Sequence, residues 1–370
     1  MPALIKQSGF AELFIKDHPL LDVRAPGEFK HGAFPNAINL PLLNDEQREA
    51  VGIKYKQTGQ QAAIATGEQL INAEEKLARL TQWQSFLRIN PHALLYCFRG
   101  GLRSEIAQQW LAENGNRIAR IEGGYKALRR FLLDTLEEVA NSSDFIIVAG
   151  KTGSGKTHLI NQLHNSVDLE GCAHHRGSAF GRRSRAQPSQ INFENSLAID
   201  FLKLCFKNLK KLFLEDESRS IGSLSIPKNL HVAMGDSPLA VIEQSVEFRV
   251  ETILHDYIIS NYQDYRQCSP EHAEELFADS LLASLDRIQR RLGGENTAQL
   301  RKIMNDALAA TDEESANTLH RNWIRHLLES YYDPMYDYQL IKKNHHVVFR
   351  GDSDEFLAWA ARINDSSDVP

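Results

Sequence analysis

The sequence predicts an α/β protein with two domains, each built around a parallel sheet. The chain has 370 residues, which is longer than most single hydrophobic cores. Short apolar segments, such as residues 93–97 and 145–149, alternate with segments of helical period. The polar, turn-forming residues 141–144 separate two groups of such segments. We therefore expect one domain over residues 1–139 and a second over 140–370.

In the first domain, three buried strands and several helices are expected. The apolar segments predict strands over residues 20–23, 93–97 and 117–121. Helical spacing follows at 104–112 and from Tyr125 to Val139, and residues 25–28 have the composition of a turn. Between them lies an insertion at about residues 44–90 that is helical in pattern and rich in polar residues. It could cap a pocket, form a domain interface or have no functional role.

In the second domain, apolar segments predict strands at four places and a large helical part near the end. The strands are expected at residues 145–149, 212–214, 241–242 and 346–349. Residues 270–340 are mostly helical in pattern and strongly charged, which indicates a helical cover on this domain or a helical subdomain.

Composition and charge exclude several classes of protein. The chain is 42% hydrophobic and 24% charged, as folded globular proteins are, and its net charge of -6 argues against a generally cationic nucleic-acid binder. Its four cysteines are scattered, without a C-x-x-C pair, which is typical of a reducing cytosol and gives no zinc-site spacing. No secretory signal and no apolar run long enough to span a bilayer is found. We expect a cytoplasmic monomer that does not associate with membranes.

A phosphate-binding loop follows the first strand of the second domain. Residues 150–157, GKTGSGKT, match G-x-x-x-x-G-K-[ST] at every fixed position, with an apolar strand before them and a helical pattern after. The glycines let backbone N–H groups turn toward anionic oxygens, and the lysine reaches the outer phosphate. The expected diphosphate-binding residues are Gly150, Gly153, Ser154, Gly155, Lys156 and Thr157. The loop indicates two or more phosphates but does not identify the molecule that carries them.

A metal-side carboxylate should stand at the end of a later strand. The segment LFLEDES, residues 212–218, supplies acids in this position. We expect Asp216 to act with the Thr157 hydroxyl on Mg²⁺, with Glu215 and Glu217 as rivals that spacing does not separate from it.

A second anion loop follows the strand at residues 93–97. Residues 97–104, CFRGGLRS, match C-x-x-G-x-x-R-[ST], so loop N–H groups and two guanidinium groups surround one thiol. The expected catalytic set is Cys97 as nucleophile with Arg99, Gly100, Gly101, Arg103 and Ser104 as the anion loop. This pattern alone fits a cysteine phosphatase or a sulfurtransferase of the rhodanese type.

Upstream residues favour the sulfurtransferase. Residues 20–24, LLDVR, and 28–41, EFKHGAFPNAINLP, resemble the two conserved blocks of a rhodanese domain, and Gly123 and Gly124 resemble the glycine pair near its end. Phosphatases with this loop usually have histidine before the cysteine, where this chain has Tyr96. The first domain is thus expected to be rhodanese-like, and the second to be P-loop NTPase-like.

The order of the two domains resembles the bacterial tRNA 2-selenouridine synthase family. The segments VGIKYK at 51–56, HRGSAFG at 175–181 and EDESRSIG at 215–222 carry further similarity. The resemblance implies replacement of sulfur by selenium in 2-thiouridine at the tRNA wobble position, through an S-geranyl intermediate. It implies geranyl diphosphate and selenophosphate as substrates, the P-loop as the diphosphate site and Cys97 as the selenium carrier. Mg²⁺ but no tightly bound organic cofactor is expected, and the enzyme that makes selenophosphate is a candidate partner.

A basic segment near the P-loop is the expected RNA contact. Residues 174–185, HHRGSAFGRRSR, are loop-like, and Phe180 offers a ring on which a base could stack. The candidate RNA-binding residues are Arg176, Phe180, Arg182, Arg183 and Arg185. A solvated charged loop and a lid over the diphosphate are the alternatives.

Two other functions fit parts of this pattern. One is a nucleotide-dependent rhodanese-type sulfurtransferase that acts on RNA or a carrier, for which ATP hydrolysis without prenyl transfer would be the evidence. The other is a non-enzymatic binding module, which the presence of Cys97 disfavours because inactive rhodanese domains tend to lose this residue.

Overall fold

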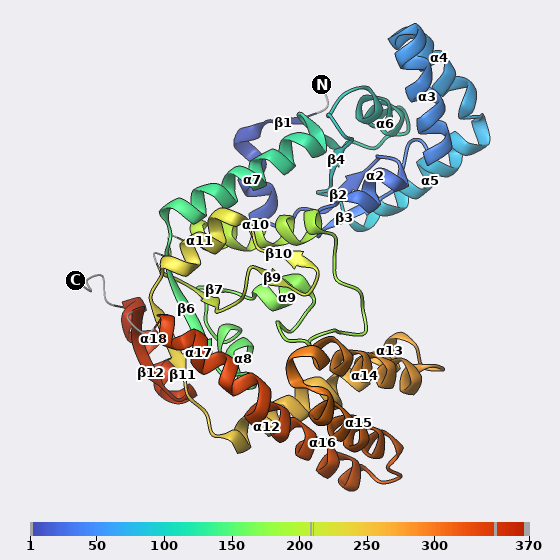
Figure 1. Cartoon of the computed structure of the whole chain (residues 1–370). Helices are drawn as coiled ribbons and strands as arrows, with labels where there is room; N and C mark the ends of the chain where they lie inside the picture. The colour runs from blue at the N-terminus through green and yellow to red at the C-terminus, as the bar shows by residue number, and fades with distance from the viewer. Residues whose placement is uncertain (1–2, 208, 210, 344–345, 366–370) are drawn as a thin grey trace. The chain divides into compact units, whose positions relative to one another are not determined.

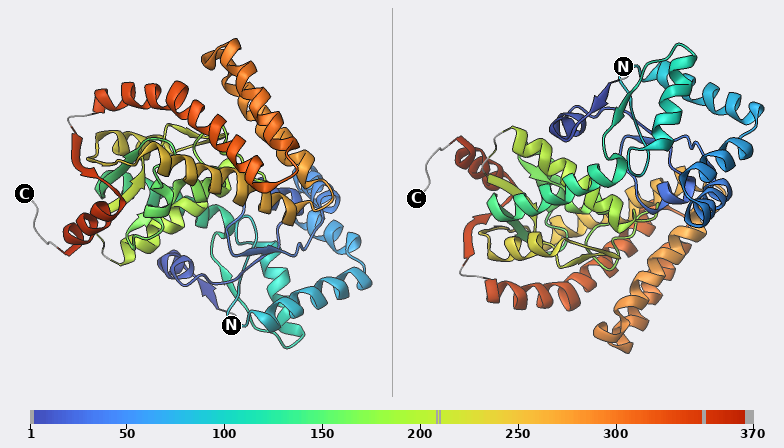
Figure 2. Two further views of the ribbon diagram at one scale, coloured as in Figure 1. Left: turned by 90° about the horizontal axis from the view of Figure 1, so that it is seen from below. Right: turned by 90° about the horizontal axis from the view of Figure 1, so that it is seen from above.

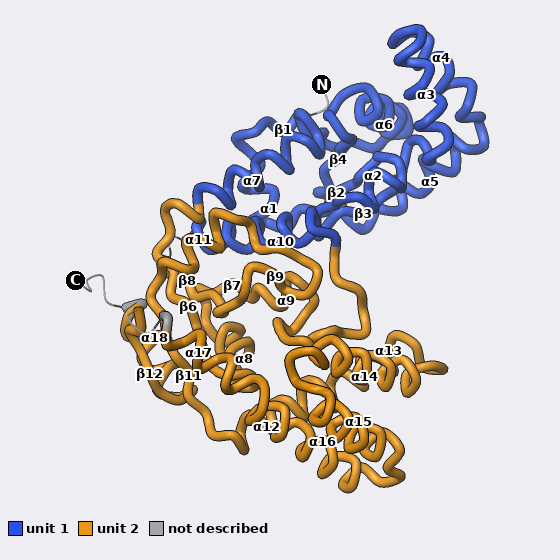
Figure 3. Tube along the Cα trace, in the orientation of Figure 1, with its two compact units in different colours: residues 1–138, 189–207 blue, residues 139–188, 208–370 orange. Residues whose placement is uncertain are grey.

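The computed structural model describes residues 3–207, 209, 211–343 and 346–365 (Figure 1). The chain divides into two compact units, one of residues 1–138 and 189–207 and one of residues 139–188 and 208–370 (Figure 3). Each unit contains a five-stranded, all-parallel sheet with helices, so the expected α/β fold with two parallel sheets is confirmed.

The first unit has the sheet order β1-β5-β4-β2-β3. All three expected strands are present in it, each trimmed by one or two residues. Its strands are β1 (Leu4–Ile5), β2 (Leu20–Asp22), β3 (Ala37–Asn39), β4 (Leu94–Tyr96) and β5 (Ala119–Ile121). Its helices are η1 (Gln7–Gly9), α1 (Phe10–Ile15), α2 (Pro26–His31), α3 (Asp45–Thr58), α4 (Gln60–Leu70), α5 (Ala73–Ile89), α6 (Leu102–Glu113), α7 (Gly124–Ser142) and α10 (Gln190–Phe206).

The insertion forms three helices, α3, α4 and α5. Asn44 caps α3 and Asn72 caps α5, each accepting a hydrogen bond from the third helical residue in a capping box. The buried Trp83 of α5 packs in the core beneath the sheet and donates its indole N–H to the Leu40 carbonyl at 2.9 Å. The insertion is therefore fixed to the sheet by its third helix.

The predicted turn at residues 25–28 is wrong, because a helix, α2, begins there. Pro26 stands at its first position, where a missing N–H costs nothing, and the Glu28 carboxylate accepts a hydrogen bond from the Ala25 N–H at 3.0 Å. Proline followed by glycine occurs both in turns and at the first positions of helices, so these two residues alone did not distinguish a turn from a helix start.

The boundary between the units differs from the continuous one expected at residues 139/140. Helix α7 continues through the polar residues 141–142, and β6 begins at Asp144. In addition, α10 belongs to the first unit although it follows the P-loop in sequence. Asn192 and Asn195 of α10 bind the Ala33 N–H and carbonyl, each at 2.7 Å, and Arg129 of α7 binds Asn195 at 2.8 Å.

The second unit has the sheet order β12-β11-β6-β8-β7 and contains the four expected strands. Its strands are β6 (Asp144–Gly150), β7 (Ser166–Val167), β8 (Lys211–Glu215), β11 (Leu239–Ile242) and β12 (Val347–Gly351), with a separate hairpin of β9 (Ser220–Ile221) and β10 (Leu224–Ser225). Its shorter helices are α8 (Lys156–Ile160), α9 (Leu169–Ala173), α11 (Lys228–Asp236), α12 (Val246–Ile253), η2 (Leu254–Ile259) and α18 (Ser353–Asp365).

The charged region near the end of the chain is helical, as expected. It comprises α13 (Ser260–Cys268), α14 (Ala273–Leu292), α15 (Gly294–Ala309), α16 (Glu313–Leu327), η3 (Leu328–Tyr332) and α17 (Asp333–Lys343), drawn in orange to red in Figure 2. These helices share one apolar core that includes Leu285, Leu300 and Trp323. Among the described residues, no helix has the length and hydropathy needed to cross a membrane.

Candidate functional sites

Cys97 lies directly after β4, at the carboxyl end of the first sheet, and is 3% exposed. Its thiol lies 3.3 Å from the Ser104 Oγ and 3.8 Å from the Gly101 carbonyl oxygen. Helix α6 begins at Leu102, so its free N–H groups and the positive end of its dipole lie at the same loop. The structure thus brings Cys97, Gly101 and Ser104 together in one loop, and anion binding by this loop stays a prediction.

The glycine pair at residues 123–124 supports this loop. Gly100 has φ of 64°, and a Cβ there would lie 2.6 Å from the Gly123 nitrogen and from the Ile121 carbonyl oxygen. The Tyr125 N–H donates to the Cys97 carbonyl at 2.9 Å. The loop backbone is thus held against the start of α7, which leaves no space for a side chain at Gly100.

The two loop arginines differ in their partners. Arg103 binds Glu28 through two hydrogen bonds of 2.5 and 3.1 Å, whereas Arg99 is exposed and, within the described chain, makes no hydrogen bond or ion pair with the protein. Burial raises the pKa of Glu28, but the hydrogen bonds and charge of Arg103 outweigh it and the net pKa is lowered. Arg103 is therefore a fixed, charge-balanced cation, and Arg99 is available to an incoming anion.

A buried ion pair lies beneath the loop. Arg24, 1% exposed, binds Asp22 at 2.7 Å and the Gly32 carbonyl at 2.7 Å, and its guanidinium lies 3.8 Å from the centre of the Tyr125 ring. Asp22 and Arg24 come from the first block that resembles a rhodanese domain, residues 20–24. Their contacts are internal to the unit, which makes them a support for the loop floor.

The insertion lines the Cys97 cavity. This cavity has a volume of about 1220 Å³ and is bounded by the Cys97 loop on one side. Helices α3 and α4 contribute Val51, Tyr55, Ala63 and Ile64 to its lining. Of the three roles considered for the insertion, the cap over the cysteine pocket is therefore the one that the structure supports.

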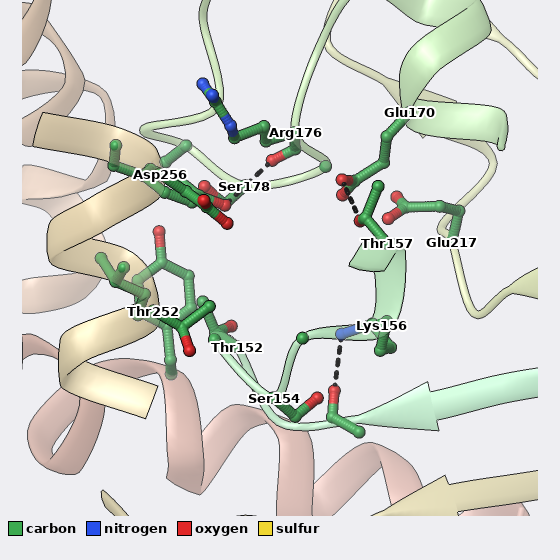
Figure 4. Close-up of a pocket in the computed structure, with 18 of the residues that line it drawn as sticks. Thr152, Ser154, Lys156, Thr157, Glu170, Arg176, Ser178, Glu217, Thr252 and Asp256 are labelled. Carbon is green, nitrogen blue, oxygen red and sulfur yellow. Dashed lines mark hydrogen bonds between the residues drawn. The ribbon is translucent and has the colours of Figure 1, made fainter. Parts of the chain in front are cut away.

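The P-loop has the backbone conformation that its glycines predict. Gly153 and Gly155 have φ of 83° and 80°, a region that residues with a side chain rarely adopt. Lys156 donates to the Gly150 carbonyl at 2.9 Å, across the loop (Figure 4). The helix that follows, α8, has only five residues, so the loop N–H groups contribute more to anion binding than a helix dipole does.

A support for the P-loop was not found from the sequence. Arg249 of α12, 2% exposed, donates to the Thr152 carbonyl at 3.1 Å and binds Asp333 at 2.7 and 3.0 Å. A Cβ on Gly153 would lie 2.7 Å from the Arg249 carbonyl oxygen. Arg249 and Asp333 are 84 residues apart, and no local pattern links them.

Three acids gather beside the P-loop lysine, and only two of them were candidates from the sequence. Glu170, at the start of α9, accepts a hydrogen bond from the Thr157 hydroxyl at 2.9 Å, and Glu217 lies beside it (Figure 4). Glu215, 1% exposed, accepts the Glu170 N–H at 3.2 Å. Burial, and then repulsion from Glu170, raises the pKa of Glu215 to about 8 and that of Glu217 well above its usual range.

These residues fit a Mg²⁺ ion that shares a bound diphosphate. Within the described ranges, no three His, Cys, Asp or Glu side chains form a metal-binding group by themselves, and Mg²⁺ in phosphate sites uses only one or two protein ligands. The Glu215 Oε1 is buried without a partner among these residues, and the acids beside it have raised pKa values, so a cation would relieve their repulsion. Thr157 with Glu170 or Glu217 would hold the ion. Asp216, the preferred acid from the sequence, also lines this cavity and stays a candidate.

The buried carboxyl of Glu215 predicts a pH-dependent stability. Below about pH 4.5 it is protonated in the folded and unfolded chains, whereas between about 4.5 and about 8 only the folded chain keeps the proton. The free energy of unfolding therefore falls as pH rises through this window, by up to about 1.4 kcal/mol per pH unit. Between pH 5 and 8 the melting temperature should fall several degrees further in the unaltered protein than in Glu215→Gln. If calorimetry shows the same change of melting temperature with pH in both proteins, the raised pKa of Glu215 is contradicted.

The basic segment at residues 174–185 is a bridged turn whose side chains point to different places. His175 pairs with Arg182 in an antiparallel bridge, and the Arg176 N–H donates to the Gly181 carbonyl at 2.9 Å. Arg176 and Arg183 line the P-loop cavity, whereas Arg182 and Arg185 are exposed. Two arginines therefore have the position of a diphosphate lid, and two are accessible to RNA.

Phe180 does not have the exposed ring that base stacking needs. It is 6% exposed and stacks on Trp323 at 5.5 Å, in the core shared by the helices of residues 250–332. Its assignment to RNA binding is therefore wrong. The local pattern showed a ring among glycines and arginines but not the helices that cover it.

Truncation of Phe180 should affect stability. Phe180→Ala is expected to lower the free energy of unfolding by about 3–4 kcal/mol through the lost contact with Trp323 and the cavity that remains, and Phe180→Leu by less. Urea denaturation measures both, with Arg182→Ala as a surface control that leaves stability unchanged. A Phe180→Ala protein of normal stability that binds anticodon RNA more weakly would restore the stacking role.

The P-loop cavity has a volume of about 1060 Å³ and contains both polar and apolar walls. The P-loop, the acids and Arg176 form one part of its lining, and the helical cover contributes a second part. The apolar and aromatic residues from helices η2 to α17 are Tyr257, Ile288, Tyr331, Tyr332, Met335 and Tyr336. The cavity can thus hold an anionic group together with an apolar one.

A cysteine anion loop on one parallel sheet and a P-loop on a second sheet define a rhodanese–P-loop fusion protein. Family models agree with both parts, since a rhodanese-like domain model matches residues 8–130 and a model of the tRNA 2-selenouridine synthase AAA domain matches residues 143–366. The chain belongs to the tRNA 2-selenouridine synthase family, as the resemblance in its motifs indicated.

Similar proteins match this chain over nearly its whole length. The tRNA 2-selenouridine synthase of Pseudomonas fluorescens (strain Pf0-1) is 48% identical over 356 residues, which are 96% of this chain and 97% of that one. Those of Photobacterium profundum and Marinobacter nauticus are each 47% identical and cover 95% of this chain. The matches cover 97% and 96% of those two proteins, respectively.

Proposed function

We propose that this protein converts 2-thiouridine at the tRNA wobble position into 2-selenouridine in two steps, each in its own cavity. The observation that carries the proposal is the presence of two unlike anion sites, a P-loop and a cysteine loop, in one chain of this family. The first step attaches a geranyl group to sulfur, and the second exchanges the S-geranyl group for selenium. The four free cysteines fit a reducing, cytoplasmic setting.

The first step uses the P-loop cavity. The sulfur of 2-thiouridine attacks the carbon of geranyl diphosphate that bears the diphosphate, the carbon–oxygen bond breaks, and its electron pair leaves on the diphosphate. The base gives its N3 proton to water, so that the product is neutral. Lys156 and the N–H groups of residues 153–157 stabilise the charge that develops there. Mg²⁺, when bound at Thr157 with the neighbouring acids, supplies further neutralisation of this leaving group.

The walls of the P-loop cavity support a prenyl donor. Behind the anion cradle, Ile288, Tyr332 and Met335 offer apolar surface to a chain of ten carbons. Arg176, whose carbonyl accepts a hydrogen bond from the Tyr257 hydroxyl, lines the part of the cavity that would hold the diphosphate. A diphosphate with a hydrocarbon tail would match both the anion-binding part and the apolar part of this cavity.

The second step uses the cysteine loop. In the route expected from the sequence, Cys97 carries selenium as a selenosulfide, with Arg99 and the loop N–H groups around it. For this, Cys97 starts the cycle as a mixed disulfide with a small thiol. Water takes the phosphoryl group of selenophosphate as the phosphorus–selenium bond breaks, the selenide attacks the Cys97 sulfur, and the small thiolate leaves. The terminal selenium attacks carbon 2 of the base, the carbon–sulfur bond breaks, and geranyl thiolate leaves with the electron pair. The small thiolate then attacks the Cys97 sulfur, the sulfur–selenium bond breaks and selenouridine leaves. The mixed disulfide forms again, so the cycle needs no net oxidant or reductant.

The exposed arginines support tRNA contact at the second unit. Arg182 and Arg185 remain accessible beside the P-loop cavity, where phosphates of an anticodon loop would meet them. This local cationic surface fits RNA in spite of the net charge of -6. Phosphate contacts of this kind weaken steeply as salt is raised.

One assay tests the donor and the first product. The protein is incubated with tRNA that contains 2-thiouridine and either geranyl diphosphate or ATP, and nucleoside masses are measured without a selenium donor. S-geranyl-2-thiouridine should form only with geranyl diphosphate. ATP hydrolysis without any geranylated nucleoside would favour the nucleotide-dependent sulfurtransferase.

A further inference from the structure

The cavity beside Cys97 is larger and more apolar than its selenium chemistry requires. Its volume of about 1220 Å³ exceeds the usual range of small-ligand pockets, about 300–1,000 Å³. Selenophosphate is a small, doubly charged anion that the loop N–H groups and Arg99 can hold by themselves. The rest of the cavity therefore has room for a second, larger group.

The apolar part of the lining comes from the insertion and from α6. Polar and charged residues, among them Arg24, Glu28 and Arg99, belong to the cysteine loop and its floor. The apolar side chains of these walls include Val51, Ala63, Ile64, Leu102, Ile106 and Trp110. One end of the cavity can thus bind an anion, and the rest of its wall is lined by apolar side chains.

Two of the apolar side chains that line the cavity, Ile64 and Leu102, lie outside the core cluster formed by the sheet, α5 and α6. Ile64 of α4 is half-buried. Leu102, at the first position of α6, is 37% exposed. Partly exposed apolar residues along a cavity cost free energy unless a ligand covers them, which indicates an apolar ligand.

We propose that this cavity binds the isoprenyl chain of the S-geranylated nucleoside, so that the leaving group is recognised where selenium arrives. The inference rests on the proposed function and adds a substrate-recognition role for the insertion. During the exchange, the attacked carbon must lie next to the selenium on Cys97. Its sulfur substituent is one bond away, and the chain extends from there along the walls of α3, α4 and α6. As the new carbon–selenium bond forms, the carbon–sulfur bond breaks and geranyl thiolate leaves through the apolar part.

The arrangement predicts selectivity for the length of the leaving group. Full-length protein and a selenium donor are mixed with anticodon stem-loop RNA that carries S-geranyl- or S-methyl-2-thiouridine, and kcat/KM for selenouridine is measured. The two thiolates have similar leaving ability, but only geranyl covers the apolar wall. The unaltered protein should prefer the S-geranyl RNA by about a hundredfold.

The test variant is Ile64→Gln, and the matched control is Ile53→Gln. Ile53 lies on the same insertion, is 48% exposed and does not line the cavity. Ile64→Gln should lower kcat/KM for S-geranyl RNA about tenfold and leave that for S-methyl RNA unchanged, whereas Ile53→Gln should match the unaltered protein for both. Equal melting temperatures of the two variants confirm that both are folded.

Three results would overturn the inference. If the unaltered protein converts both RNAs equally, or if Ile64→Gln lowers both rates alike, the cavity does not recognise the chain, while selenouridine formation leaves the proposed function intact. If neither RNA gives selenouridine, the exchange step itself is wrong, and the inference fails with it. Geranylation of 2-thiouridine RNA by Ile64→Gln, measured separately, should equal that of the unaltered protein.

Discussion

Cys97→Ser protein is expected to accumulate S-geranyl-2-thiouridine tRNA and to form selenouridine at least about a thousandfold more slowly than the unaltered protein. The reason is local. Cys97 lies in the loop that precedes α6. A serine at this position can keep the contact with the Ser104 Oγ, but its hydroxyl cannot carry selenium. The P-loop cavity is lined entirely by residues of the other unit, so geranylation should continue at the normal rate. Nucleoside mass spectrometry measures both products in one sample.

Two other cysteines provide the control for this variant. Cys205 and Cys268 are exposed and lie outside both cavities, so their serine variants should form selenouridine normally. Selenouridine formation by Cys97→Ser at the normal rate would show that selenium reaches the base without this thiol.

Lys156→Ala protein should lose geranylation by about a thousandfold, the second large effect. Lys156 is the lysine at the fixed position of the P-loop motif, and in the described structure its Nζ contacts the Gly150 carbonyl across the loop, close to where the diphosphate would lie. Alanine removes the charge that stabilises the departing diphosphate but leaves the glycine conformations intact. The measurement is the initial rate of S-geranyl-2-thiouridine formation at saturating geranyl diphosphate.

A second substrate separates loss of chemistry from loss of folding in this variant. Lys156→Ala should convert tRNA that already carries S-geranyl-2-thiouridine into selenouridine at the normal rate, because this step needs only the cysteine loop. Lys228→Ala, an exposed substitution on α11 in the same unit, should behave normally in both assays. Normal geranylation by Lys156→Ala would exclude the P-loop as the prenyl-donor site.

The sequence predicted those parts of the sites that depend on short, continuous segments. Cys97 lies between β4 and α6, and Lys156 is the first residue of α8, which follows β6. In each loop, glycines at fixed positions of the motif give the backbone its conformation. Such loops depend on local backbone geometry, which a single segment encodes. For the same reason the expected strands are all present.

The parts that the sequence did not reveal depend on contacts between distant segments. Glu170 approaches Thr157 only because α9 folds back over the P-loop, and Arg249 meets Asp333 across 84 residues. Helix α10 joins the first unit through two asparagines that hydrogen-bond to Ala33, although it lies beyond the P-loop in sequence. The burial of Phe180 has the same origin, since helices far along the chain cover it.

The central claim is that the S-geranylated nucleoside is an intermediate, which the P-loop cavity forms and the cysteine loop then converts into 2-selenouridine. The most direct measurement uses purified tRNA with S-geranyl-2-thiouridine and the unaltered protein, with selenophosphate present and geranyl diphosphate absent. We predict complete conversion to 2-selenouridine, with release of geranyl thiol in equal amount. If the geranylated tRNA remains unchanged while 2-thiouridine tRNA is selenated directly under the same conditions, the two-step account is contradicted.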